Sequence, residues 1–183
     1  MGTDTHVALI RGINVGHARR VSMADLRALV EDLGYGHVRT LLNSGNVLFA
    51  APGTAPSDAA ARIEQSLGAR LGVSARVTAL TTAELAAAVA VNPLLEVADD
   101  PSRLMVAVLA NPADRMRLER FLAQDWAPEA LALGARVVAY LWCPQGVIAS
   151  RLWEAVGHVL GDAVTTRNWA TVTKLHALAG DQR

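Results

Sequence analysis

The order of strand-like and helix-like segments constrains the fold of this chain most, because the same order occurs twice in its 183 residues. In the first half, helical spacing of apolar residues alternates with short apolar runs that have the length of strands. Ser22 and Gly34 are start and stop signals of a helix, and Asn43-Ser-Gly-Asn46 is typical of a hairpin turn. The predicted segments are a strand at 6–10, a helix at 22–34, strands at 38–42 and 47–50, a helix beginning at 56 and a strand at 73–80.

The second half repeats this order after a connecting helix. Thr81-Thr-Ala-Glu84 resembles a capping box, and the alanine-rich helix that follows it ends near Asn92-Pro93. The later segments are a strand at 104–109, a helix at 114–124, strands at 130–133 and 137–142, a helix at 151–160, a strand at 163–165 and a helix from 168 to about 178.

This double pattern predicts an α+β protein of two ferredoxin-like (βαββαβ) units in tandem, each with a mainly antiparallel sheet and helices on one face. We expect the first unit at residues 1–80, a connecting helix and linker at 81–99, and the second unit with a C-terminal helix at 100–183. The strand order of such a unit is 4-1-3-2, so the third strand lies antiparallel between the first and the second.

Composition narrows the classes of partner. Hydrophobic residues make up 52% of the chain, which is ample for a core, and 17 basic residues balance 17 acidic ones. The chain has no net charge to attract polyanions, so the composition argues against nucleic acid as a partner. The single Cys143, a start without a secretory pattern and the lack of a long apolar run predict a cytoplasmic protein that does not contact membranes.

The expected strand order brings two polar segments to one end of the first sheet. These are the loop after the first strand, with Gly16 among its residues, and the hairpin turn. Together these segments supply an arginine guanidinium, backbone amides of glycines and the start of a helix at Ser22. Such groups are typical of an anion-binding site. An equally open alternative is that the glycines and asparagines only serve the turns. The predicted ligand-binding residues of this rim are Arg11, Gly12, Asn14, Ser44, Gly45 and Asn46.

A second polar motif opens the last helix. Asn168 stands where a helix N-cap belongs, followed by an apolar stripe at three-residue intervals. Arg167, Thr171 and Lys174 would share the other face if the helix begins this early, and we add Arg167, Asn168 and Lys174 to the candidate ligand-binding residues. The alternative is an ordinary solvated helix face.

No residue pattern points to a catalytic group, a metal or a cofactor. Gly12-Ile-Asn-Val-Gly16 is not the dinucleotide fingerprint, the histidines lack metal-ligand spacing, and no histidine base accompanies Cys143, which we expect to be inert. Arg115, Arg117 and Arg120 are interpreted as the solvated side of a helix. Two functions stay open: binding, with or without transformation, of a small carboxylate or phosphate, and a protein- or RNA-interaction module.

Several separated motifs resemble a known family when taken together. They are Arg11-Gly-Ile-Asn-Val-Gly16, Met23-Ala-Asp-Leu-Arg27, Asn43-Ser-Gly-Asn46 and Thr166-Arg-Asn-Trp169 through Lys174-Leu175. The chain resembles the family called domain of unknown function 1697 over almost its whole length. The resemblance implies a bacterial protein of two ferredoxin-like halves, with no settled activity.

Overall fold

The structure is a computed structural model that describes residues 4–14, 20–135 and 138–181. The chain forms two compact units. Unit 1 comprises Met1–Leu85 together with Leu178–Arg183, and unit 2 comprises Ala86–Ala177. Each unit is described by itself. Among the helices of the described residues, none combines the length and the apolar character that a membrane span requires.

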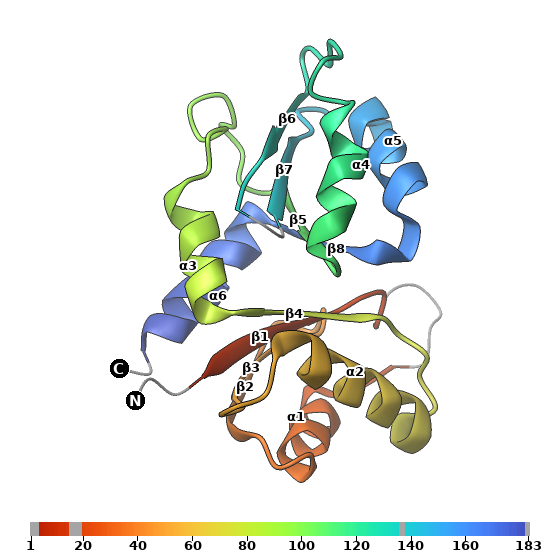
Figure 1. The fold of residues 1–183 in the computed structure, drawn as a ribbon, viewed down its shortest axis with the longest axis vertical. Coiled ribbons are helices and arrows are strands. Elements are labelled where there is room, and N and C mark those ends of the chain that lie inside the picture. Colours follow the sequence, from red (N-terminus) through yellow and green to blue (C-terminus); the bar gives the residue numbers. More distant parts are fainter. Residues whose placement is uncertain (1–3, 15–19, 136–137, 182–183) are drawn as a thin grey trace. The chain divides into compact units, whose positions relative to one another are not determined.

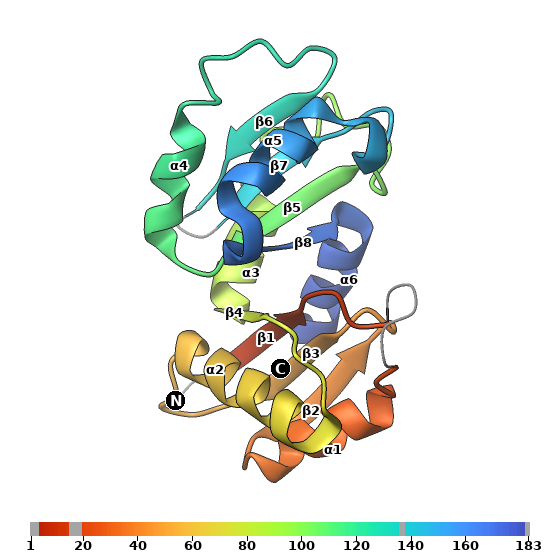
Figure 2. The same ribbon diagram turned by 90° about the vertical axis from the view of Figure 1, so that its right-hand side faces the viewer.

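Unit 1 is a four-stranded sheet with two helices on one face (Figures 1 and 2). The strand order is β2-β3-β1-β4, and every neighbouring pair is antiparallel. The elements are β1 (Thr5–Ile10), α1 (Met23–Asp32), β2 (Gly36–Leu41), β3 (Asn46–Ala50), α2 (Pro56–Ser66), which continues into a π-helical turn at Leu67–Leu71, and β4 (Val77–Thr81).

The alternation of the strands explains the core of unit 1. Successive side chains of a strand point to opposite faces, so every second residue of β1 and β3 faces α1 and α2. The apolar stripes of the two helices pack onto these residues. The main members of this core are Ala8, Ile10, Leu26, Leu29, Val30, Val47, Phe49, Ile63 and Leu67.

Unit 2 repeats the antiparallel arrangement with the order β6-β7-β5-β8. Its core lies between the sheet and the helices α4 and α5, and it includes Leu118, Leu141, Leu152 and Val156. The division between the units falls within α3 and within α6. The elements are α3 (Thr82–Ala90), β5 (Leu104–Leu109), α4 (Met116–Glu119), β6 (Ala130–Leu133), β7 (Val138–Trp142), α5 (Arg151–Leu160), β8 (Val164–Asn168) and α6 (Trp169–Gly180).

The other face of the unit 2 sheet is also covered. Tyr140 of β7 points away from the α4 and α5 side, is fully buried and donates a hydrogen bond of 2.6 Å to the carbonyl of Ala88 in α3. Ala88 lies in the last turn of α3, where carbonyls have no partner within the helix. Helices therefore lie on more than the one face that the sequence predicts for this unit.

The expectation of an α+β chain with mainly antiparallel sheets is confirmed, while several boundaries differ. The helix predicted at 114–124 is only Met116–Glu119, preceded by a 3-10 turn at Pro112–Arg115. After it, the amides of Phe121 and Leu122 bond three residues back, and the indole of Trp126 donates to the carbonyl of Phe121 (2.8 Å). These bonds replace the next turn of α-helix. The strand predicted at 137–142 begins, within the described residues, at Val138.

Candidate functional site

The loop after β1 and the β2–β3 turn lie side by side in unit 1. Ile10 donates its amide to the carbonyl of Gly45 (2.8 Å), and Leu9 pairs with Asn46 in the sheet. Arg11 continues the pairing beyond the strand, because its amide donates to the carbonyl of Arg76 (2.8 Å). The structure thus brings Arg11 to Asn14 together with Ser44 to Asn46. Gly16 lies outside the described residues.

Asn14 holds this loop through its side chain. The Nδ2 group donates to the carbonyls of Val21 (2.9 Å) and Asn43 (2.8 Å), and Oδ1 accepts from the amide of Val21 (2.8 Å). Both donor hydrogens of the amide are therefore used by the backbone. Asn14 joins the loop to the segment before α1 and to the hairpin turn, so its role is to position the rim.

Asn46 does the same for the turn itself. It begins β3, is fully buried, and donates to the carbonyl of Leu41 (2.8 Å) and to Oγ of Ser44 (3.0 Å). A buried amide without these bonds would be strongly unfavourable. Because Nδ2 is engaged on both sides, Asn46 fixes the exposed Ser44 hydroxyl at the rim.

Four residues of the rim have left-handed backbone conformations. They are Gly12 (φ 71°), Asn14 (φ 60°), Leu42 (φ 58°) and Gly45 (φ 78°). Leucine adopts this region rarely, which is why β2 ends at Leu41 and not at the predicted residue 42. At Gly45 a side chain has no room, since an added Cβ would lie 2.7 Å from Cδ1 of Ile13. Glycine adopts this region without strain, so the strained residues are Asn14 and Leu42, and strain of this kind clusters at functional sites.

The start of α1 is less available than the sequence suggests. Ser22 Oγ accepts from the amide of Asp25 (3.0 Å) and donates to the Asp25 carboxylate (2.7 Å). The cap thus occupies one of the amides that an anion would need, and a carboxylate lies beside it. Among the six residues predicted for the rim, Arg11 is the one with a positively charged side chain.

The C-terminal motif divides between a strand and a helix. Asn168 ends β8 and caps α6, because its Oδ1 accepts from the amide of Thr171 (3.0 Å). Arg167 lies in β8, where burial lowers the pKa of its guanidinium to about 10. Thr171 is buried, whereas Lys174 is exposed on α6. The expectation that Arg167, Thr171 and Lys174 share one helix face is wrong, since the strand continues through Asn168 rather than ending at 165.

The nine predicted site residues therefore form two groups. Six of them belong to the unit 1 rim, and Arg167, Asn168 and Lys174 belong to unit 2. The sequence missed the backbone partners of the rim amides, the carbonyls of Val21 and Leu41. The spacing of apolar residues does not indicate which backbone carbonyls accept hydrogen bonds from side chains. These two acceptors are therefore seen only in the folded structure.

Cys143 and the acidic and histidine side chains form no further centre in the described ranges. Cys143 is buried, and this burial raises the pKa of its thiol, so the reactive thiolate is disfavoured. Within residues 4–14, 20–135 and 138–181, no group of three metal-ligating side chains could hold an ion.

Comparison with known proteins places this geometry in context. The family model described as "Protein of unknown function (DUF1697)" matches residues 3–139. A conserved bacterial protein from Streptococcus pneumoniae has a similar solved structure, with a TM-score of 0.76 and 20% sequence identity over 96% of this chain and 98% of that chain. This likeness shows the fold alone. Among curated proteins, none matches the sequence.

Proposed function

Since this chain belongs to the DUF1697 family of proteins of unknown function, we propose a function from the rim itself: it binds a small anionic ligand, a carboxylate or a phosphate, at the loop after β1 and the β2–β3 turn. The observation that carries the proposal is the cluster of left-handed residues, which includes Leu42 and Asn14. Each strained non-glycine residue costs on the order of 1 kcal/mol or more, so such a cluster is more readily explained by a site than by a plain turn.

Side-chain hydrogen bonds join the described segments of the rim. Asn14 joins the loop, the segment before α1 and the turn through three hydrogen bonds. Asn46 stabilises the turn by donating to the carbonyl of Leu41. A loop fixed in this way loses little entropy when a ligand binds. Asn14 and Asn46 are thus proposed as positioning residues.

The groups that contact the ligand would be those that the two asparagines hold in place. Arg11 supplies the charge, since a guanidinium binds a carboxylate or phosphate through two parallel hydrogen bonds. Gly12 offers backbone in open space, where an added Cβ would meet nothing within 4 Å. Ser44 and Gly45 complete the polar edge. Arg167, Asn168 and Lys174 of unit 2 are retained as further proposed ligand-binding residues, with Arg167 in β8 and Lys174 on α6.

Isothermal titration with inorganic phosphate and with citrate tests the proposal. We expect Arg11→Ala to weaken binding about ten- to hundredfold, which follows from about 1.5 to 3 kcal/mol for a charge-assisted hydrogen bond. Arg11→Lys should recover part of the affinity, because it keeps the charge without the planar fork. Arg27→Ala, an exposed arginine on α1, is the matched control for charge. An Arg11→Ala protein that melts lower but binds as well as the parent would refute the anion site.

Recognition of RNA by the sheets has little support. Such binding uses exposed aromatic side chains on central strands. Phe49 of β3 is fully buried against α1 and α2, and Tyr140 and Trp142 of β7 are buried as well. Binding of a small molecule is therefore the better proposal.

We also propose that the two sheets are tandem ferredoxin-like units, 1–80 and 100–183, joined by 81–99, although the compact unit 1 also takes in Leu178–Arg183 from the end of the second segment. The support is that corresponding strands follow the same order in the two sheets, β4-β1-β3-β2 and β8-β5-β7-β6, and that neighbouring strands are antiparallel in both. A cytoplasmic location is part of the same proposal and is open to test by cell fractionation.

A further inference from the structure

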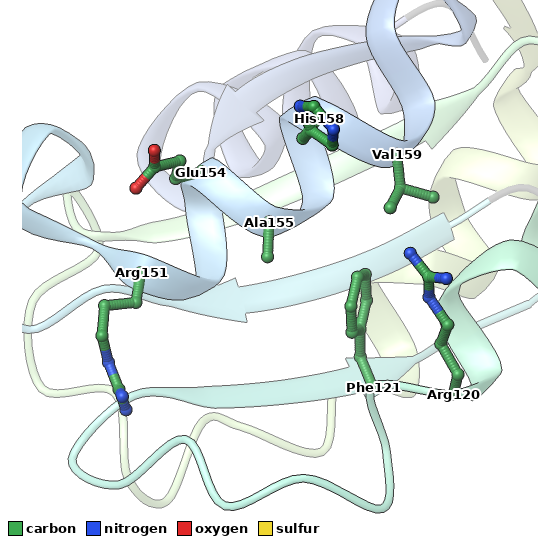
Figure 3. A pocket seen from close by; sticks show the side chains of 7 residues that line it. All are labelled: Arg120, Phe121, Arg151, Glu154, Ala155, His158 and Val159. Atoms are coloured by element: carbon green, nitrogen blue, oxygen red, sulfur yellow. The ribbon is translucent and has the colours of Figure 1, made fainter.

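A hollow of about 340 Å³ lies between α5 and the chain that follows α4 in unit 2 (Figure 3). This volume is at the lower end of the range for small-molecule sites. One wall is a single face of α5, because its residues recur at helical spacing. They are Arg151, Glu154, Ala155, His158 and Val159.

The opposite wall is built from Arg120 and Phe121. Phe121 is buried, its ring meets that of Trp126 edge to face at 5.7 Å, and its carbonyl accepts from the Trp126 indole. The Arg120 guanidinium lies over the Phe121 ring, 5.0 Å from its centroid. Arg120 is exposed, as the sequence predicts, and it lies at the edge of the hollow.

The charges of the hollow are separated along its length. In Figure 3, Arg151 and Glu154 lie at one end, and Arg120 and Phe121 lie at the other, with Ala155 between them. Within the described part of the chain, no ion pair or hydrogen bond engages the Arg120 or Arg151 guanidinium. The Arg120 end is therefore positive and lined by apolar atoms.

The amides at the start of α5 do not contribute to this site. The Glu129 carboxylate accepts from the amides of Arg151 (3.1 Å) and Leu152 (2.8 Å), and Ser150 Oγ accepts from that of Trp153 (2.9 Å). Because these two side chains occupy the amides of the first turn, the helix start offers none of them to an anion, and the permanently charged cations that line the hollow are the Arg120 and Arg151 guanidinium groups.

Beyond the function proposed for the rim, and independently of it, we infer that this hollow binds a small organic acid with an apolar body. Its carboxylate would pair with Arg120, away from the like charge of Glu154. Its apolar body would cover Phe121, Ala155 and Val159 and remove their surface from water. Inorganic phosphate has no apolar body and is not expected to bind here.

The test is a titration of the full-length, ¹⁵N-labelled protein with 3-phenylpropionate, followed by NMR. We expect saturable shifts of backbone amides around Phe121 and from Glu154 to Val159. The uncharged analogue 3-phenylpropanol should bind about three- to tenfold more weakly, in line with an ion pair at a partly exposed site. Arg120→Ala should weaken the acid by the same factor and leave the alcohol unchanged, and Arg120→Lys should restore part of the loss.

Arg27→Ala removes one positive charge in unit 1 and is the control for net charge. Equal affinity for the acid and the alcohol, shifts scattered over both units, or an Arg120→Ala protein that binds the acid like the parent would each overturn the inference. Since the expected amide shifts and the Arg120 variants lie in unit 2, whereas the rim and its Arg11 variants lie in unit 1, failure here is distinguishable from failure of the rim.

Discussion

The two tyrosines of the chain allow a matched test of what a buried hydroxyl contributes. Tyr140 donates to the carbonyl of Ala88, whereas the buried hydroxyl of Tyr35 has no partner among the described residues. Tyr140→Phe should lower the free energy of unfolding by about 1 to 3 kcal/mol, because it leaves the Ala88 carbonyl buried and unpaired. Tyr35→Phe removes an unpaired polar atom and should be neutral or stabilising.

The contribution of Tyr140 to the free energy of unfolding should also depend on pH. Burial raises the pKa of Tyr140 from its ordinary value of 10.0 to about 12 in the folded protein. The fold therefore favours the protonated phenol, so this stability is complete below pH 10 and is lost as the pH rises through 12. The loss amounts to about 1 kcal/mol at pH 11 and approaches about 3 kcal/mol well above pH 12. Tyr140→Phe lacks this loss.

Urea unfolding at pH 8 and at pH 11 measures both effects. All four tryptophans lie in unit 2, at 126, 142, 153 and 169, so their fluorescence reports the unit that contains Tyr140. Circular dichroism follows the whole chain and so includes Tyr35. The stability gap between the parent and Tyr140→Phe should narrow at pH 11. A gap that is equal at the two pH values, or a Tyr35→Phe protein destabilised as much as Tyr140→Phe, would refute the reasoning.

Further predictions concern the rim and the start of α5. Gly45→Ala should destabilise unit 1 by more than about 1 kcal/mol, because the new Cβ would lie 2.7 Å from Ile13 and the left-handed φ disfavours alanine. Gly12→Ala is the control, since Gly12 has a similar φ but open space around it, and it should cost less. Equal urea midpoints for the two variants would contradict this prediction. Ser150→Ala should lower the stability of unit 2 by about 1 kcal/mol through loss of the α5 cap. Tryptophan fluorescence in urea measures it, and an unchanged midpoint would mean that Glu129 suffices as the cap.

The sheets could be predicted from the sequence because alternation and hairpin chemistry are local signals. The strands at 104–109 and 130–133 and the helix at 151–160 have the predicted bounds. The early end of α4 could not be predicted in this way. The hydrogen bond from the Trp126 indole to the Phe121 carbonyl competes with helix formation, and it exists only once the chain after α4 has folded back. The apolar spacing of 114–124 carries no sign of that bond.

The site was predictable in its location and not in the roles of its residues. Strand order places Arg11 beside Ser44, as simple topology requires. The side chain of Asn14, however, reaches Asn43, which is 29 residues away, and only tertiary structure reveals that its amide is already used. A sequence pattern shows which polar side chains are present at a rim. It does not show which of them are already hydrogen-bonded to the backbone.

Unit 1 is discontinuous in sequence, since it contains Leu178–Arg183 as well as the first 85 residues. Arg39 of β2 donates a hydrogen bond (3.3 Å) to the carbonyl of Leu178. During synthesis the ribosome delivers the chain from its N-terminus, so the strands of unit 1 leave the exit tunnel long before this partner does. The nascent first sheet therefore cannot form the last of its own contacts until the chain has been translated through Leu178, and a ribosome that stalls before this residue leaves the sheet incomplete.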